Sequence, residues 1–198
     1  MASVASWVVW RLQPPPLERE AARLAGCWFR GDAACVLAYA DEADRVAYQL
    51  DEAKVKVLMS ESIAVMTPED GRVEVAVQPG TSTAVGSTRF RSIRGRSIGA
   101  GFLVTRTPEG YRSPGLITSV LLTLSVAHQV PDLTKLDGAI KLRAWGQYAR
   151  EQGPRWTKAG FPGILRDPDE GLIPWENWAA SCEARLARAL APRKPTQP

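Results

Sequence analysis

The sequence predicts an α+β domain, with a mixed β-sheet mainly from the first half of the chain and covering helices mainly from the second half. Two β-rich runs flank a Pro-Glu-Asp-Gly segment, and longer segments with helical periodicity follow residue 113. Of the 198 residues, 45% are apolar and 23% are charged, which is typical of a globular protein. We expect one domain over residues 1–191, with its α+β core at about 34–106, its helical part at about 113–191, and a flexible tail at 192–198.

The first elements are predicted from turn and capping signals. Residues 6–12 alternate well enough for a first strand, which the three prolines from Pro14 would end. Residues 17–24 predict a short helix, because acidic residues occupy the first turn and Gly26 lies near its end.

The next segments are short and apolar, so their periodicity is less specific. Residues 34–40 read as a short apolar strand, and residues 45–50 alternate as a strand would. Residues 51–59 fit either a helix or a strand, and we favour the helix.

A β-hairpin is the clearest local prediction. The runs 62–67 and 72–77 flank the turn residues Pro68 to Gly71. Pro presets φ for the second residue of a turn and Gly accepts a positive φ at its end, so these residues suit a hairpin loop. After a polar loop at 79–84, we expect Gly86 to lie at a strand-to-helix turn, with a short strand following at 101–105.

The rest of the chain is predicted to be mostly helical. The helices cover residues 113–129, 131–152 and 173–191, and each has a proline near its start, where the missing N–H costs nothing. No apolar run approaches the roughly 20 residues that a membrane helix needs, so we expect no membrane association.

Cysteine use and the first residues indicate a cytoplasmic protein. Cys27, Cys35 and Cys182 are odd in number and widely spaced, which favours buried thiols over a disulfide framework. Residues 1–12 lack the basic region and the cleavage site of a signal peptide. The chain has 19 Arg among its 25 basic residues, a bias typical of GC-rich bacterial coding.

Charge is distributed unevenly along the chain. Residues 41–74 hold nine acids and four basic residues, whereas residues 79–112 hold six arginines and one acid, Glu109. The second segment therefore predicts an electropositive surface for the phosphates of a nucleotide or a nucleic acid. The alternative is a solvated arginine-rich face, or one that pairs with the acidic segment inside the fold.

The predicted hairpin and the residues after it resemble the nucleotide-binding core of the ParB/sulfiredoxin superfamily. Gly86, Arg89, Phe90 and Arg91 match in order the Gly-x-x-Arg box that these proteins carry after a similar hairpin. Ser87 and Thr88 stand where ParB proteins have Glu and Arg, and the loop at 78–84 would be an insertion.

The resemblance implies a protein that acts on nucleotides and DNA. A solitary domain of this size is similar to the plasmid fertility-inhibition factors, such as the oncogenic suppression activity proteins, which block conjugative DNA transfer. That family implies ATP, Mg²⁺ and DNA as ligands, ATPase or DNase activity, and a component of the conjugation or secretion machinery as a partner.

Physical chemistry supports an anion site at the same residues. A glycine lets the backbone approach a phosphate, hydroxyls add donors, and an arginine can engage phosphate oxygens with two hydrogen bonds. The predicted phosphate-binding residues are Gly86, Ser87, Thr88, Arg89 and Arg91. The predicted nucleic-acid contacts are Arg91, Arg94, Arg96, Arg106 and Trp156, the last as a base-stacking residue in a Gly/Pro-rich loop.

Catalysis would need a carboxylate that holds a metal near Arg89, because Ser87 replaces the glutamate of the ParB box. Glu74 is the first choice and Glu61 the second, although no spacing defines a metal site. Two further functions stay open, a non-enzymatic nucleic-acid-binding module and a structural subunit in which Arg89 pairs with Glu74 or Glu61. His128 and the pair Trp145 and Trp178 are expected to have structural roles.

Overall fold

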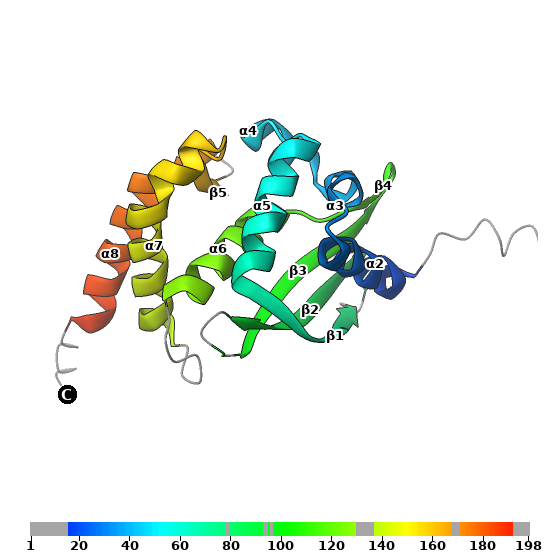
Figure 1. Cartoon of the computed structure of the whole chain (residues 1–198), viewed down its shortest axis with the longest axis horizontal. Helices are drawn as coiled ribbons and strands as arrows, with labels where there is room; N and C mark the ends of the chain where they lie inside the picture. The colour runs from blue at the N-terminus through cyan, green and yellow to red at the C-terminus, as the bar shows by residue number, and fades with distance from the viewer. Residues whose placement is uncertain are drawn as a thin grey trace, which may run out of the picture.

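The computed structural model describes residues 16–77, 80–92, 95, 97–129, 137–167 and 171–191. Over these residues the chain forms seven helices, a four-stranded sheet and a separate two-stranded sheet, which confirms the α+β class (Figure 1). The elements are α2 (Leu17–Arg30), α3 (Ala33–Tyr39), α4 (Glu42–Tyr48), α5 (Glu52–Val65), β1 (Met66–Val77), β2 (Thr83–Ser92), β3 (Ser97–Thr107), β4 (Gly110–Arg112), α6 (Leu116–Gln129), α7 (Gly138–Lys158), β5 (Gly163–Asp167), β6 (Gly171–Pro174) and α8 (Trp175–Leu190). The strand predicted at 6–12 and the tail at 192–198 lie outside the described residues.

The main sheet has the strand order β1-β2-β3-β4, and each neighbouring pair is antiparallel. The prediction of a mixed sheet was therefore wrong. Short connections join successive strands, and such connections allow only antiparallel pairing between neighbours. One face of β2 and β3 packs against α2 and α6, whereas α7 and α8 lie away from the sheet (Figure 1).

Two predicted strands are helices. Residues 34–39 fall in α3, with Ala40 directly after its end, and residues 45–50 fall mostly in α4. Each helix begins at an aspartate whose side chain accepts a hydrogen bond from the backbone N–H three residues later, Asp32 for α3 and Asp41 for α4. Each cap accepts a hydrogen bond from a backbone N–H in the first turn of its helix, a group that has no partner within the helix. This stabilisation favours a helix over the strand that the short apolar runs predicted.

The predicted hairpin at 62–77 was also wrong. Residues 62–65 complete helix α5, and β1 continues through Pro68 to Gly71 instead of turning back. The register with β2 shifts between Pro68, which lies opposite Phe90, and Val73, which lies opposite Thr88. The turn-forming residues thus form a bulge in an edge strand, a place where proline and glycine are tolerated.

The helices of the second half are confirmed, with shifted ends. The second one begins at Gly138, capped by Asp137, and continues through Pro154 to Lys158. The strands β5 and β6 between α7 and α8 were not predicted. Tyr48 and Thr118 both donate to the carbonyl of Ile164, each at 2.9 Å, and so attach this small sheet to α4 and α6.

The cysteines differ from the expectation of three free thiols. Cys27 and Cys35 form a disulfide, while Cys182 is free and buried as predicted. The helices α2 and α3 are separated only by Gly31 and Asp32, and this tight reversal brings the two Cα atoms to 5.9 Å, within disulfide range. Among the described helices, none combines the length and the apolar character needed to cross a membrane.

Candidate nucleic-acid interface

Gly86 lies in the middle of β2, not at a strand-to-helix turn. Its Cα pairs with Val75 of β1 on one side and with Phe102 of β3 on the other. β2 continues to Ser92 and β3 begins at Ser97, so no helix N-terminus follows Gly86. The predicted phosphate cradle, which needs free N–H groups at such a turn, is therefore not formed.

Strand geometry also divides the predicted phosphate-binding residues between two faces. Side chains alternate along a strand, so residues three apart, such as Gly86 and Arg89, point to opposite faces. Gly86 and Thr88 are buried on the side of α2 and α6, which we call the covered face. Ser87, Arg89 and Arg91 lie on the other side, which we call the open face.

Gly86 has a packing role on the covered face. A Cβ built at this position would overlap Cζ of Phe102, the residue directly across from it on β3. The ring of Phe102 thus occupies the space that any larger residue at position 86 would need. The glycine that carried the family resemblance is explained by this cross-strand contact.

The open face is flat and accessible around two arginines. Arg89 lies opposite Gly99 and Arg91 lies opposite Ser97, and all four residues are exposed. A Cβ at Gly99 would meet no atom within 4 Å, so the fold itself does not demand a glycine there. Glycine in a strand interior can mark a place where another molecule approaches the backbone.

Arg89 and Arg91 differ in their acidic neighbours. Arg91 lies 3.6 Å from the carboxylate of Glu69, which also accepts a hydrogen bond from Ser97 at 2.8 Å. Arg89 forms no ion pair with any residue that the structure describes. The expected alternative, in which Arg89 pairs with Glu74 or Glu61, is not found.

The two predicted catalytic carboxylates lie in different surroundings. Glu74 is exposed on β1 opposite Ser87, and so lies on the open face. Glu61 is on α5 and forms an ion pair with Arg155 of α7. Within the described residues, neither belongs to a group of three potential metal ligands, and the two carboxylates do not lie together at one site.

The remaining predicted contacts are dispersed. Trp156, expected in a loop, is on α7 with 2% of its surface exposed, and its Nε1–H donates to Tyr148 at 2.9 Å. It is a core residue and cannot stack on a base. Arg106 is exposed near the end of β3, while Arg94 and Arg96 lie outside the described residues.

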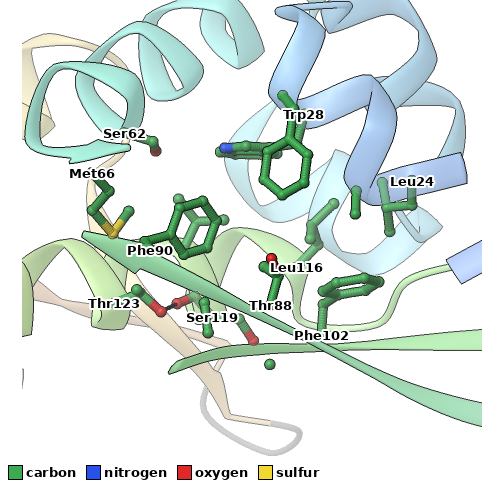
Figure 2. Close-up of a pocket in the computed structure, with 15 residues that line it drawn as sticks. Leu24, Trp28, Ser62, Met66, Thr88, Phe90, Phe102, Leu116, Ser119 and Thr123 are labelled. Carbon is green, nitrogen blue, oxygen red and sulfur yellow. Dashed lines mark hydrogen bonds between the residues drawn. The ribbon is translucent and has the colours of Figure 1, made fainter. Parts of the chain in front are cut away.

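Two hollows adjoin the sheet. The first, of about 50 Å³, is an apolar space between α2, α6 and the covered face, into which Phe90 and Phe102 project (Figure 2). The second, of about 510 Å³, includes Asp41 and Asp44 in its lining but no basic residue. Ligand pockets usually measure about 300–1,000 Å³, so the first is too small for a nucleotide and the second has the wrong charge.

Compared with protein-family models, with curated proteins and with solved structures, the chain matches none of them. The resemblance to the ParB/sulfiredoxin superfamily therefore stays a prediction from the sequence. What the geometry brings together is smaller than the predicted site: Ser87, Arg89, Arg91 and Glu74 on one open sheet face. The exposed glycine at position 99, opposite Arg89, was not predicted from the sequence, although the alternation of small residues from Ser97 to Gly101 could have indicated it.

Proposed function

We propose that the protein binds the phosphate backbone of duplex DNA, without sequence preference, on the open face of its sheet. The observation that carries the proposal is the charge of the β2–β3 unit. Residues 83–107 include five arginines and no acid. Two of them, Arg89 and Arg91, are exposed on β2. The residues opposite them on β3, Gly99 and Ser97, are also exposed and have no large side chain.

The kind of nucleic acid follows from what this face lacks. Single strands are usually held by aromatic side chains on which the bases stack. The aromatic residues of β2 and β3, Phe90 and Phe102, face the core on the covered side. Besides Glu74 and the carboxylate of Glu69 beside Arg91, this face presents arginine, serine and glycine, and Arg89 has no acidic partner among the described residues. Such a surface suits phosphate contacts, which position a duplex but do not read its sequence.

We infer no hydrolytic step, because Glu74 and Glu61 lie in different surroundings and neither of the two hollows suits ATP. Among the functions considered from the sequence, the non-enzymatic nucleic-acid-binding module is thus the one that the geometry favours. Inhibition of conjugative transfer would then act through occupancy of DNA, in the cytoplasm.

The test compares two double variants that lose the same charge. R89A/R91A removes the arginines of the open face, and R185A/R188A removes two exposed arginines of α8, away from the sheet (Figure 1). Binding of a labelled duplex is measured by fluorescence anisotropy between 50 and 200 mM salt. A charge-assisted contact contributes about 1.5–3 kcal/mol, so R89A/R91A should weaken binding by at least about tenfold.

The salt dependence adds a second readout. Each phosphate contact adds about 0.9 to the magnitude of the negative slope of log affinity against log salt, so R89A/R91A should reduce that magnitude by about 1.8. R185A/R188A should change neither quantity appreciably. Equal losses in the two variants, or wild-type binding that does not respond to salt, would contradict the proposal. Duplex RNA and single-stranded DNA of the same length establish whether the duplex form and the sugar matter.

A further inference from the structure

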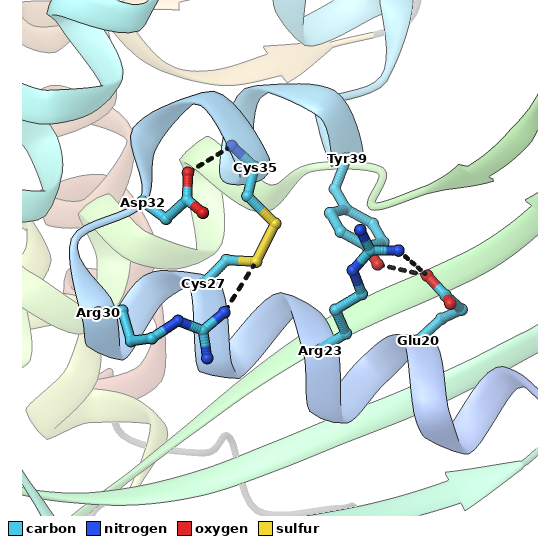
Figure 3. The surroundings of a disulfide bond; sticks show 7 residues. All are labelled: Glu20, Arg23, Cys27, Arg30, Asp32, Cys35 and Tyr39. Carbon is cyan, nitrogen blue, oxygen red and sulfur yellow. Dashed lines mark hydrogen bonds and ion pairs between the residues drawn. A yellow bond between two sulfur atoms is a disulfide. The ribbon is translucent and has the colours of Figure 1, made fainter.

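The disulfide joins the end of α2 to the beginning of α3 (Figure 3). Gly31 takes a left-handed conformation with φ 72°, and the chain reverses within two residues. Asp32 then begins α3, because its carboxylate accepts a hydrogen bond from the N–H of Cys35 at 3.0 Å. The site is therefore made of local structure and does not depend on distant parts of the chain.

The two sulfurs differ in their access to solvent. Cys27 is 1% exposed and lies among core residues, whereas Cys35 is half-buried. Thiol–disulfide exchange requires a thiolate to reach one sulfur of the bond, so access decides which sulfur is attacked. A thiolate from solution can approach Cys35, and Cys27 is then the leaving group.

The leaving sulfur has a cation beside it. Nη2 of Arg30 lies 3.8 Å from Sγ of Cys27 (Figure 3). The guanidinium folds back along α2 over Gly26, where a Cβ would lie 3.0 Å from Nη1 of Arg30. Glycine weakens a helix interior by about 0.5–1 kcal/mol relative to alanine, and at this position its missing side chain makes room for the cation.

We propose that Cys27 and Cys35 form a thiol–disulfide exchange site for small thiols, with Arg30 stabilising the departing thiolate. A small thiolate attacks Sγ of Cys35, the Cys27–Cys35 bond breaks, and its electron pair leaves on Cys27. A second small thiolate attacks the small-thiol sulfur of the mixed disulfide and releases Cys35 as a thiolate. Two small thiols are oxidised to their disulfide, the protein disulfide is reduced, and the two protons of the small thiols pass to the cysteines.

Other contacts allow the pair to close again. The hydroxyl of Tyr39 on α3 donates to the carboxylate of Glu20 on α2, so the two helices stay joined when the disulfide is open (Figure 3).

The carboxylate of Asp32 lies within 4.8 Å of both sulfurs and disfavours a negative charge on either of them. The cation of Arg30 is therefore the more important for the departing thiolate. Disulfides of cytoplasmic proteins, the location predicted from the sequence, are usually transient and catalytic or redox-sensing.

Cys182 supplies the contrast within the same chain. It is buried between α7 and α8, and burial raises the pKa of its thiol to about 11. A thiol with that pKa carries almost no thiolate at neutral pH and should not react in the folded protein. It therefore serves as an internal control for unfolding during the experiment.

The experiment treats the folded protein with reduced glutathione, quenches samples by alkylation, and maps the products by mass spectrometry. Trypsin separates the two cysteines, because cleavage after Arg23, Arg30 and Arg45 places Cys27 in peptide 24–30 and Cys35 in peptide 31–45. We expect the early glutathione adduct on peptide 31–45, with Cys182 unreacted. An adduct first on Cys27, or reduction only together with exposure of Cys182, would overturn the proposal.

The role of Arg30 is tested against another exposed arginine of the same helix. R30A should slow the opening of the disulfide by about threefold or more, because the leaving thiolate loses its cation. R30K keeps the charge and should recover most of the rate, and R19A, which removes an exposed cation near the start of α2, should match the wild type. Equal rates in R30A and R19A, with folding of each verified by thermal unfolding, would contradict the assignment of Arg30.

Discussion

The two faces of the four-stranded sheet use one strand for different purposes. On the covered face, Gly86 and Phe90 pack against aromatic and aliphatic side chains, and their sizes are fixed by their neighbours. On the open face, Arg89 and Gly99 are exposed; among the described residues Arg89 has no ion-pair partner, and a Cβ at Gly99 would meet no atom within 4 Å. Residues adjacent in sequence can therefore be under unrelated constraints. Because side chains alternate between the faces of a strand, Gly86 and Arg89 could act in one site only if the strand ended between them.

The largest expected effect is on the covered face at Phe90. Its ring is 7% exposed and meets the ring of Phe29 edge-on, with 5.7 Å between centroids. Truncation of a buried phenylalanine costs about 3–5 kcal/mol, so F90A should lower the free energy of unfolding by that amount in urea titrations. R89A, one residue earlier on the open face, should change it by less than about 0.5 kcal/mol. Similar losses in the two variants would contradict the division into two faces.

A second prediction separates interior and open face by pH. Burial raises the pKa of Tyr148 to about 12, against 10.0 for an ordinary tyrosine. Between about pH 10 and pH 12 the unfolded chain loses this proton while the folded chain keeps it, so the free energy of unfolding should fall by up to about 2–3 kcal/mol as pH rises. Burial and the neighbouring Glu20 also raise the pKa of Tyr39, which adds to the fall.

Measurement of urea midpoints from pH 8 to pH 11 covers the first half of this window, in which about 1.4 kcal/mol of the loss from Tyr148 should appear. Y148F removes one titrating group and should show a shallower loss than the wild type. Arginine keeps its charge throughout this range, so the proposed DNA binding should stay constant while the protein remains folded. An alkaline loss of stability that is as steep in Y148F would mean that Tyr148 is not its source.

The helices α6, α7 and α8 could be predicted from the sequence because each segment is long and has a proline near its predicted start, and their ends shifted only to caps such as Asp137. Helix α5 was predicted only in part, because residues 51–59 fitted a helix or a strand and residues 62–65 were assigned to the hairpin. The short helices α3 and α4 could not be recognised from six or seven residues of apolar pattern, which fit a buried strand equally well. Asp32, Asp41 and Asp51, spaced nine and ten residues apart, are the signal that was available, since each caps the helix after it.

The candidate site was predictable only in part, for a geometric reason. The charge asymmetry pointed to the segment that holds β2 and β3, where Arg89, Arg91 and Arg106 are exposed, because local charge needs no knowledge of the fold. The sequence predicted a hairpin turn at Pro68 to Gly71 and, after it, a strand-to-helix turn at Gly86. In the structure, Pro68 to Gly71 form a bulge and Gly86 lies inside a strand, so Gly86 and Arg89 do not share a face. The disulfide likewise depends on the tight reversal at Gly31, which spacing alone does not reveal.

The smallest expected effects concern two glycines of the sheet, and they give the most direct comparison of its faces. At Gly86 a Cβ would overlap the ring of Phe102, whereas at Gly99 it would meet nothing within 4 Å. An added methyl in a packed site costs about 1–3 kcal/mol, so G86A should destabilise the protein by that amount. G99A should be neutral or slightly stabilising, because alanine restricts the unfolded chain more than glycine does. In the background of F102A the ring is gone, and G86A should then cost less than about 0.5 kcal/mol, so that a double-mutant cycle reports a coupling of at least about 0.5 kcal/mol.

The same two variants separate DNA binding from stability. If the open face receives a DNA backbone close to the strand, G99A should weaken duplex binding without loss of stability, while G86A should lower stability without changing the affinity of the folded protein. A G99A protein that binds duplex DNA as tightly as the wild type would remove the glycine from the proposed interface and leave it to the arginines alone.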